Sequence, residues 1–340
     1  MVTVHDVARE AGVSISTVSR ALATPDKVAG ATRDRVRAAA QELGYRPNRA
    51  AAVLRAGRSG AYGLVVPDLA NPYFAAVAKG AQERAREHGT GLFIVDTDED
   101  PDLEAEAIGA LAPQTDGVVL CSPRAAERAL DALAGRPVVL VNHDVDGVPA
   151  VEADHRGGMR RALEHLRALG HRRVAYVGGP ESSWSDRRRR AGLADASARY
   201  DDVEVVGLGA FRPRVEGGQA AADLVVASGA TAVVTFNDLV AVGLVDRLRA
   251  RGLDVPRDLS VVGCDDSYVA SLVTPPLTTL HVDLRRLGRA AVDRLVATAS
   301  PLRGHDEARP TVPDVPPLDV ELVVRSSTAP PVTDPSRGAP

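Results

Sequence analysis

The chain has 340 residues, of which 45% are apolar and 3% aromatic, and its formal net charge is −4. This length predicts two or three domains with apolar cores, and no apolar run approaches the ~20 residues that a membrane-spanning helix needs. The only two cysteines, Cys121 and Cys264, lie in separate strand-like runs, which favours reduced buried thiols over a metal cluster or disulfide framework. The amino-terminal MVTVHDVARE lacks a signal-peptide pattern, so we expect a cytoplasmic protein.

Charge is distributed unevenly along the chain. Residues 1–58 carry ten Lys and Arg against five acids, a net of +5, and the remaining 282 residues carry −9. A small basic module joined to a larger acidic one favours a polyanionic partner for the basic part. The alternative is that the basic residues simply form a solvated face.

The stretch REAGVSISTVSRAL, residues 9–22, has the pattern of two short helices with a turn between them. Thr3 is expected to cap the first helix, and Asp6 completes a Thr-x-x-Asp capping box. Gly12 ends that helix because glycine reaches left-handed backbone angles at little cost. Ser14 then caps the second helix.

The second helix is sparsely apolar. Val18, Ala21 and Leu22 are spaced to face the first helix, which leaves hydroxyl groups and one guanidinium on the outer face. Such a face suits the base edges and phosphates of a DNA groove. Ile15 lies at the edge of the apolar stripe, so it is either core or within reach of a thymine methyl group. The expected DNA contacts from this region are Thr3, Ser14, Ile15, Ser16, Thr17, Ser19 and Arg20.

A third helix is predicted with Thr32 as its cap and Gly44 at its end. Three short helices predict an all-α helix-turn-helix DNA-binding domain over residues 1–46. Pro47 disfavours continuation of the third helix, and Asn48 can cap a further segment of about two turns. That segment is shorter than the ~12–15 residues at which an isolated helix is marginal, so it should fold only with help such as DNA.

Three motifs, TVHDVAREAGVSISTVSRAL, TRDRVRAAAQELGYRPN and AAVLRAGRS, resemble the headpiece of the LacI/GalR (lactose-repressor) family of bacterial transcriptional regulators. In that family a hinge helix orders on the operator and wedges a leucine into the minor groove. The resemblance implies a hinge helix and linker over 47–59, with Leu54 as the wedge and Arg55 beside it. A core role for Leu54 is disfavoured by its small apolar neighbours. The expected hinge contacts are Asn48, Arg49, Leu54 and Arg55.

From residue 61 onward, strand-like and helix-like segments alternate, and the rhythm restarts near RRVAYVGG. This pattern predicts an α/β module of two doubly wound parallel sheets with a cleft between two lobes. The resemblance extends here and implies a periplasmic-binding-protein-like, effector-binding and dimerisation domain over 60–328. We expect its lobes at approximately 60–157 plus 284–310 and 158–283 plus 311–328. The Pro-rich end, 329–340, should be a disordered tail that cannot form a tetramerising bundle.

Ligands of such sheets bind beyond the carboxyl ends of the strands. The family positions that contact effector match Tyr73, Phe74, Asn142, Ser185, Arg189, Phe211, Asn237 and Asp265. Each alone also fits a surface loop or a helix cap, as Asn237 does. Asn142 stands where the family often has Asp, and His143 where Arg or an aromatic residue is common. We expect one or two arginines of the run 187–190 in the cleft, Arg189 among them, and Asp265 on the opposite lobe, an arrangement that favours a neutral sugar or polyol over a sugar phosphate.

Motifs of the common enzyme classes are absent: there is no Walker-type loop, no paired-His zinc motif and no Gly-x-Ser-x-Gly elbow. We therefore expect no enzyme, no catalytic residues, no metal and no cofactor. The resemblance implies a homodimeric, allosteric regulator, a repressor of carbohydrate catabolism genes, that binds near-palindromic operator DNA under the control of a carbohydrate effector. The rival hypothesis is a sugar-binding or sugar-modifying protein with an accessory DNA-binding module, which turnover of the ligand would reveal.

Overall fold

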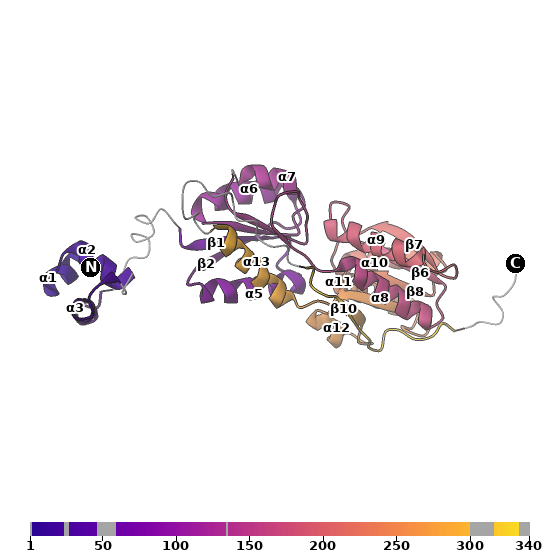
Figure 1. The fold of residues 1–340 in the computed structure, drawn as a ribbon. Coiled ribbons are helices and arrows are strands. Elements are labelled where there is room, and N and C mark those ends of the chain that lie inside the picture. Colours follow the sequence, from indigo (N-terminus) through magenta and orange to yellow (C-terminus); the bar gives the residue numbers. More distant parts are fainter. Residues whose placement is uncertain (1, 24–26, 46–58, 134, 300–315, 333–340) are drawn as a thin grey trace. The chain divides into compact units, whose positions relative to one another are not determined.

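The computed structural model describes residues 2–23, 27–45, 59–133, 135–299 and 316–332 (Figure 1). The chain divides into two compact units between Gly60 and Ala61. We call residues 1–60 the headpiece and residues 61–340 the effector module. The predicted hinge contacts Asn48, Arg49, Leu54 and Arg55 lie outside the described residues.

The described part of the headpiece contains three helices, α1 (Val4–Glu10), α2 (Ile15–Ala23) and α3 (Gly30–Glu42). Its buried core consists only of valine and alanine side chains, namely Val7, Ala8, Ala11, Val18, Ala21, Val36, Ala39 and Ala40. Gly12 has φ +63°, and the Val13 N–H donates to the Ala8 carbonyl at 3.0 Å. This left-handed turn confirms that Gly12 ends the first helix.

The start of the third helix differs from the prediction. Helix α3 begins at Gly30 with Ala29 at the N-cap, and the Thr32 N–H donates to the Ala29 carbonyl at 3.0 Å. Thr32 is therefore inside the helix and is not its cap, because the Ala29 carbonyl accepts the first helical bonds without a capping side chain. Gly44, with φ +64°, ends the helix as predicted.

The first lobe contains a five-stranded parallel sheet in the order β2-β1-β3-β4-β5. The strands are β1 (Ala61–Val66), β2 (Gly91–Asp96), β3 (Val118–Cys121), β4 (Val138–Val141) and β5 (Ala150–Val151). The helices that follow the first three strands are α5 (Pro72–Glu87), α6 (Pro101–Leu111) and α7 (Ala126–Ala132), with a 3-10 turn, η2 (Ala112–Gln114), after α6. Strands β1 and β3 are buried at every residue, which is typical of central strands in a parallel sheet covered by helices.

The second lobe contains a six-stranded sheet in the order β11-β10-β9-β8-β6-β7. Its strands are β6 (Arg173–Gly178), β7 (Glu204–Ala210), β8 (Ala232–Thr235), β9 (Ser260–Asp265), β10 (Thr278–His281) and β11 (Glu321–Val323). The helices after residue 154 are α8 (His155–Ala168), α9 (Trp184–Ser197), α10 (Val215–Ala227), α11 (Asp238–Ala250), α12 (Tyr268–Leu272) and α13 (Leu284–Ala299). Strand β11 runs antiparallel to β10, so this sheet is not wholly parallel.

Helix α13 returns to the first lobe and lies along α5 (Figure 1). The two backbones approach closely at a pair of glycines. A Cβ atom on Gly288 would lie 2.1 Å from the Val77 carbonyl oxygen, and one on Gly80 would lie 2.1 Å from the Arg285 carbonyl oxygen. Glycine is therefore required on both helices at this crossing.

The prediction that the disordered tail begins at residue 329 is wrong. The Ala329 N–H donates to Ser260 Oγ at 3.0 Å, and a His171 ring nitrogen lies 3.0 Å from the Ala329 carbonyl oxygen. Residues 329–332 are therefore described and anchored to the second lobe, because the backbone of Ala329 satisfies buried polar side chains there. Residues 333–340 lie outside the described part.

Both cysteines are free and buried, as predicted, and burial raises the pKa of the Cys121 thiol to about 12. Across the described ranges, no helix combines the length and apolar character needed to cross a membrane.

Candidate functional site

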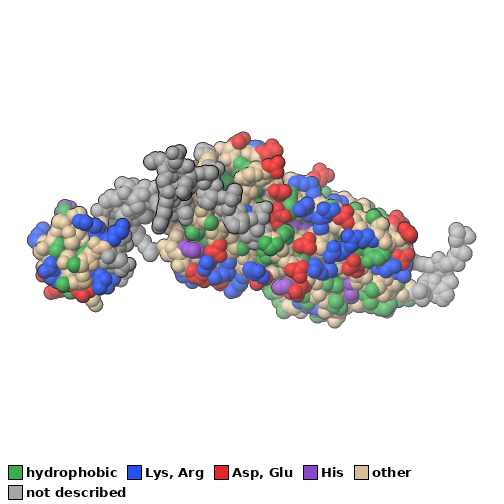
Figure 2. Space-filling view, viewed as in Figure 1, with side chains coloured by type: hydrophobic (Ala, Val, Ile, Leu, Met, Phe, Trp, Pro, Cys, Tyr) green, Lys and Arg blue, Asp and Glu red, His purple; other side chains and the backbone are tan. Residues whose placement is uncertain are grey.

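The outer face of α2 is the candidate DNA-binding surface. Ser14 caps the helix as predicted, since its Oγ accepts from the Thr17 N–H at 3.2 Å. Ser14, Ser16 and Arg20 are exposed, and Thr17 and Ser19 are half-buried. The Arg20 Nε donates to the Ser16 carbonyl at 3.2 Å, which holds the guanidinium stem along this face. Figure 2 shows Lys and Arg side chains on the visible face of the headpiece.

Two further headpiece residues were predicted to contact DNA. Ile15 is 37% exposed and lies outside the buried core, so its position favours the thymine-methyl interpretation over the core interpretation. Thr3 is exposed, and both its N–H and its hydroxyl donate to the Asp6 carboxylate, at 2.9 and 2.7 Å. Those hydrogen bonds lower the pKa of Asp6.

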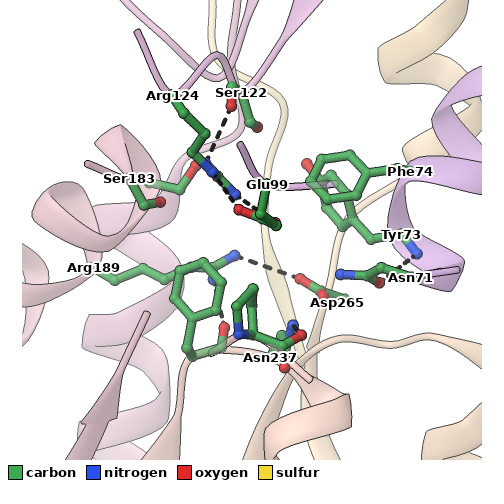
Figure 3. Close-up of a pocket in the computed structure, with 13 residues that line it drawn as sticks. Asn71, Tyr73, Phe74, Glu99, Ser122, Arg124, Ser183, Arg189, Asn237 and Asp265 are labelled. Carbon is green, nitrogen blue, oxygen red and sulfur yellow. Dashed lines mark hydrogen bonds and ion pairs between the residues drawn. The ribbon is translucent and has the colours of Figure 1, made fainter. Parts of the chain in front are cut away.

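The effector module contains an open cavity between its lobes (Figure 3), where the empty space, including the part open to solvent, is about 360 Å³. Segments that follow strands of both sheets supply the walls, as expected for open α/β sheets. The first lobe contributes Asn71, Tyr73, Phe74, Glu99, Ser122 and Arg124. The second lobe contributes Ser183, Ser185, Arg189, Pro213, Phe236, Asn237 and Asp265.

The cavity brings together six of the eight residues predicted from the sequence, all except Asn142 and Phe211. Asn142 is buried behind the wall, where its Nδ2 donates to the Tyr73 hydroxyl and its Oδ1 accepts from the Ala153 N–H at 3.0 Å. Both polar atoms of this short side chain are therefore already hydrogen-bonded, and Nδ2 positions the Tyr73 hydroxyl. Phe211 packs against the apolar core of the second lobe. Neither residue lines this cavity, and their predicted contact with effector stays a prediction.

The wall from the second lobe is centred on a buried ion pair. Arg189 Nη2 lies 3.4 Å from Asp265 Oδ1, and the two side chains are 4% and 6% exposed. The Arg189 guanidinium also donates to the Phe236 carbonyl and lies 4.6 Å from the centre of the Phe236 ring. Burial raises the pKa of the Asp265 carboxyl well above its ordinary value, and the Arg189 charge opposes that shift.

The expectation that Asp265 lies on the opposite lobe from Arg189 is wrong. Arg189 is on α9 and Asp265 ends β9, and both elements belong to the second lobe. The parallel order of this sheet brings the end of β9 to the edge that the start of α9 covers. The two charges therefore compensate each other within one wall of the cavity.

The first lobe presents a second ion pair that the sequence analysis missed. Arg124 donates to both oxygens of Glu99, at 2.5 and 2.9 Å, and its side chain is 4% exposed (Figure 3). The buried Glu104 carboxylate fixes the Arg124 backbone by accepting its N–H at 2.8 Å. Both residues of the pair directly follow strands, in TDED after β2 and CSPR after β3. The strand-end rule would have found them had it been applied to every strand.

Asn237 serves as both helix cap and cavity residue. Its Oδ1 accepts from the Val240 N–H and its Nδ2 donates to the Pro213 carbonyl, both at 2.9 Å. The neighbouring Asp238 accepts hydrogen bonds from Ser267 and Thr279. Burial raises the pKa of Asp238 to about 6. The two interpretations of Asn237, cap and cavity residue, are thus compatible.

Arg189 is the arginine of the 187–190 run that lines the cavity, within the one or two that were expected. Arg189 is buried, Arg188 lies 3.9 Å from Glu152, and Arg190 donates to Asp186 at 2.5 Å. Successive helical side chains point about 100° apart, which separates these three. His143 is not in the cavity wall and stacks on Trp184 with ring centres 6.4 Å apart.

A helix-turn-helix unit followed by a bilobed α/β module with a polar interlobe cavity defines a ligand-responsive transcriptional regulator. Comparison with known protein families gives the same class. Residues 3–48 match the bacterial regulatory proteins of the lacI family, and residues 163–328 match the periplasmic binding protein-like domain. The chain belongs to the LacI family of transcriptional regulators.

Among similar proteins is the HTH-type transcriptional regulator DegA of Bacillus subtilis, 33% identical over 96% of this chain and 98% of the relative. The regulator MalR of Streptomyces coelicolor is 34% identical over 95% of this chain and 96% of its own length. Both relatives are HTH-type transcriptional regulators.

Two solved structures resemble the whole chain. The lac repressor dimer bound to operator and the anti-inducer ONPF has a TM-score of 0.84 and 31% identity, over 96% of this chain and 99% of that one. The complex of the transcriptional regulator CelR with cellobiose has a TM-score of 0.68 and 31% identity, over 96% of this chain and 100% of that one.

Proposed function

We propose that this regulator is a dimeric repressor whose affinity for operator DNA is controlled by a neutral sugar or polyol bound in the interlobe cavity, and that it is not an enzyme. The observation that carries the proposal is the charge balance of the cavity. Its four charged side chains form two internal ion pairs, Arg189 with Asp265 and Arg124 with Glu99. A ligand in this cavity therefore needs hydroxyl groups more than it needs charge.

The remaining polar groups suit a polyhydroxylated ligand. Within the described part of the structure, Arg189 Nε is buried and has no hydrogen-bond partner. A buried donor of this kind is normally satisfied, so it is available for a ligand oxygen. Ser183 and Ser185 add hydroxyl groups, and the rings of Tyr73 and Phe74 offer apolar faces to the C–H surface of a sugar. CelR, which binds cellobiose, supports a carbohydrate.

On the DNA side, the exposed face of α2 would enter the major groove of each half-site. Phosphate contacts would supply affinity, and Ser16 and Arg20 would supply sequence choice. The segment that contains Asn48, Arg49, Leu54 and Arg55 would enter the minor groove, with Leu54 as the wedge. The similar lac repressor dimer is bound to operator, which supports a dimer and operator DNA as its partner. Near-palindromic operator DNA is the expected partner.

The test begins with selection of operator DNA from a random pool by the full-length protein. Binding to the selected DNA is then measured by fluorescence anisotropy with a panel of neutral sugars, polyols and sugar phosphates. We expect a neutral compound to raise the thermal midpoint of the protein and to change its DNA affinity. A phosphorylated compound that binds far more tightly than its neutral parent would contradict the neutral effector. Chemical conversion of the bound sugar would instead favour the sugar-modifying alternative.

A further inference from the structure

Arg214 connects the two lobes beside the cavity. It is the N-cap residue of α10 in the second lobe, and its guanidinium pairs with two carboxylates of the first lobe. Nε donates to Asp68 Oδ2 at 2.9 Å, and Nη2 donates to Asp98 Oδ1. The Asp68 side chain is only 6% exposed, so solvent screens this pair less than an ordinary surface salt bridge.

The two carboxylates lie on loops that are hydrogen-bonded into one unit. The Glu99 N–H donates to the Pro67 carbonyl at 2.7 Å, and the Leu69 N–H donates to Asp96 Oδ2 at 2.8 Å. Asp98 and Glu99 also have φ values of +48° and +62°. Non-glycine residues keep left-handed angles where the surrounding contacts fix them. This backbone directs Asp98 to Arg214 while its neighbour Glu99 lines the cavity.

The second-lobe side of the contact is also fixed by a cavity residue. Pro213, the residue before Arg214, lines the cavity, and its carbonyl accepts from Asn237 Nδ2 at 2.9 Å. Gly217 packs closely on the same loop, because a Cβ there would lie 2.0 Å from the Arg212 carbonyl oxygen. Arg214 therefore has little freedom to move unless the cavity wall moves with it.

We propose that Arg214, Asp68 and Asp98 form an interlobe latch that holds the lobes closed, with Arg214 as a positioning residue for ligand binding. On each lobe the latch is one residue away from a cavity residue, Glu99 on the first and Pro213 on the second. A ligand that contacts either residue therefore acts on the latch directly. The proposed closure of the lobes does not depend on which ligand binds in the cavity. Only the effect of the latch on effector affinity rests on the proposed function.

The test measures the distance between the lobes in the full-length protein without ligand. Spin labels are placed by Glu106→Cys on α6 and Ala220→Cys on α10, both exposed positions, while the buried Cys121 and Cys264 stay unlabelled. Pulsed dipolar spectroscopy then gives the distance distribution between the two labels, which is compared between the labelled protein with Arg214 and the same protein with Arg214→Gln. We expect Arg214→Gln to shift the distance distribution to longer values and to broaden it.

The matched control is Arg251→Gln. Arg251 is 38% exposed against 37% for Arg214, and it pairs at 2.6 Å with Asp223 of its own lobe. This control should leave the distances unchanged. Asp98→Asn, at a carboxylate that is 72% exposed, should reproduce part of the shift in a chain that circular dichroism shows to be folded.

Unchanged distances in folded Arg214→Gln, or an equal shift in Arg251→Gln, would overturn the latch. Because no sugar is present in this measurement, its failure is separate from failure of the proposed function. A sugar panel without any binder would overturn the neutral-sugar effector and leave the latch standing.

Discussion

The headpiece exposes the side chains that we propose to bind DNA, whereas the effector module buries those that we propose to bind effector. In the headpiece, valine and alanine fill the core, and the polar residues of α2 are exposed or half-buried at its surface. In the effector module, Arg189 and Asp265 are nearly inaccessible and hydrogen-bonded into the fold. A surface residue can change specificity without touching the core. A buried charged residue cannot, so ligand binding and stability are coupled in the effector module and separable in the headpiece.

The largest expected effect is that of Arg189→Ala. Removing the guanidinium leaves Asp265 buried without its cation, which should lower the free energy of unfolding of the effector module by about 3–5 kcal/mol. Calorimetric titration should show no sugar binding. The double variant Arg189→Met/Asp265→Leu should recover stability but not binding. An unchanged free energy of unfolding in Arg189→Ala would contradict the coupling between ligand binding and stability.

A second effect, of about 3 kcal/mol in the free energy of unfolding, is expected when the pH changes. Burial raises the pKa of Asp238 to about 6 from 3.8, so between these pH values the folded state binds more protons than the unfolded state. The contribution of Asp238 to stability should therefore fall as pH rises from 4 to 6. The difference in free energy of unfolding between the native protein and Asp238→Asn measures this, and a flat difference would contradict it.

The headpiece counterpart of this titration is Asp6, which has the opposite sign. Hydrogen bonds from Thr3 lower the pKa of Asp6, so its contribution is present above the unfolded pKa and is lost as pH falls through the folded value. Asp6→Asn should therefore lower the thermal midpoint of the headpiece at pH 7 more than at pH 3. An equal decrease at both pH values would exclude this role.

Gly288→Ala should destabilise the effector module by about 1–3 kcal/mol, because the new methyl group would overlap the Val77 carbonyl on the neighbouring helix. Gly109→Ala is the control within the module, since a Cβ there meets nothing within 4 Å. Gly30→Ala is the headpiece counterpart, where the nearest atom lies 3.9 Å away. Urea unfolding should show a loss only for Gly288→Ala, and equal losses at all three sites would refute the packing argument.

The smallest effect on stability is expected for Arg20→Ala. It should weaken binding to the selected operator by about 1–3 kcal/mol and change the free energy of unfolding by less than ~0.5 kcal/mol. Anisotropy titration and thermal unfolding of the same preparation measure both quantities. Unchanged operator affinity would remove Arg20 from the DNA-binding surface, and a large loss of stability would show that the headpiece does not separate the two properties.

Local sequence patterns predicted the features that depend on local geometry. Gly12 and Ser14 mark a turn and a cap through backbone angles and hydrogen bonds between near neighbours, and both predictions are confirmed. Asn237, which follows a predicted strand, likewise lies at the cavity, whereas Arg189 was placed there by the family resemblance. The prediction for Thr32 is wrong because several nearby residues can begin a helix and a side-chain cap is not obligatory.

Features that depend on tertiary pairing were not accessible to the same reasoning. The predicted lobe bounds, 158–283, already place Asp265 with Arg189, so the expectation of opposite lobes conflicts with them; only the pairing of the two side chains lacks a local signal. Asn142 occupies a strand end like the cavity residues, but its side chain is taken by Tyr73 and the Ala153 backbone. Strand ends mark Glu99 and Arg124 as candidate cavity residues, but their pairing across 25 positions becomes visible only when β2 and β3 flank β1 in the sheet.

The returning path of the chain has a consequence for synthesis. Helix α13 packs on α5 of the first lobe, and β11 then completes the edge of the second sheet. Neither lobe is contiguous in sequence, so neither can be completed until a segment near the carboxyl end has left the ribosome. The headpiece, by contrast, has all of its described helices within residues 4–42 and emerges first. Helix α2, which we propose binds DNA, is therefore synthesised before the interlobe cavity, which we propose binds effector, is complete.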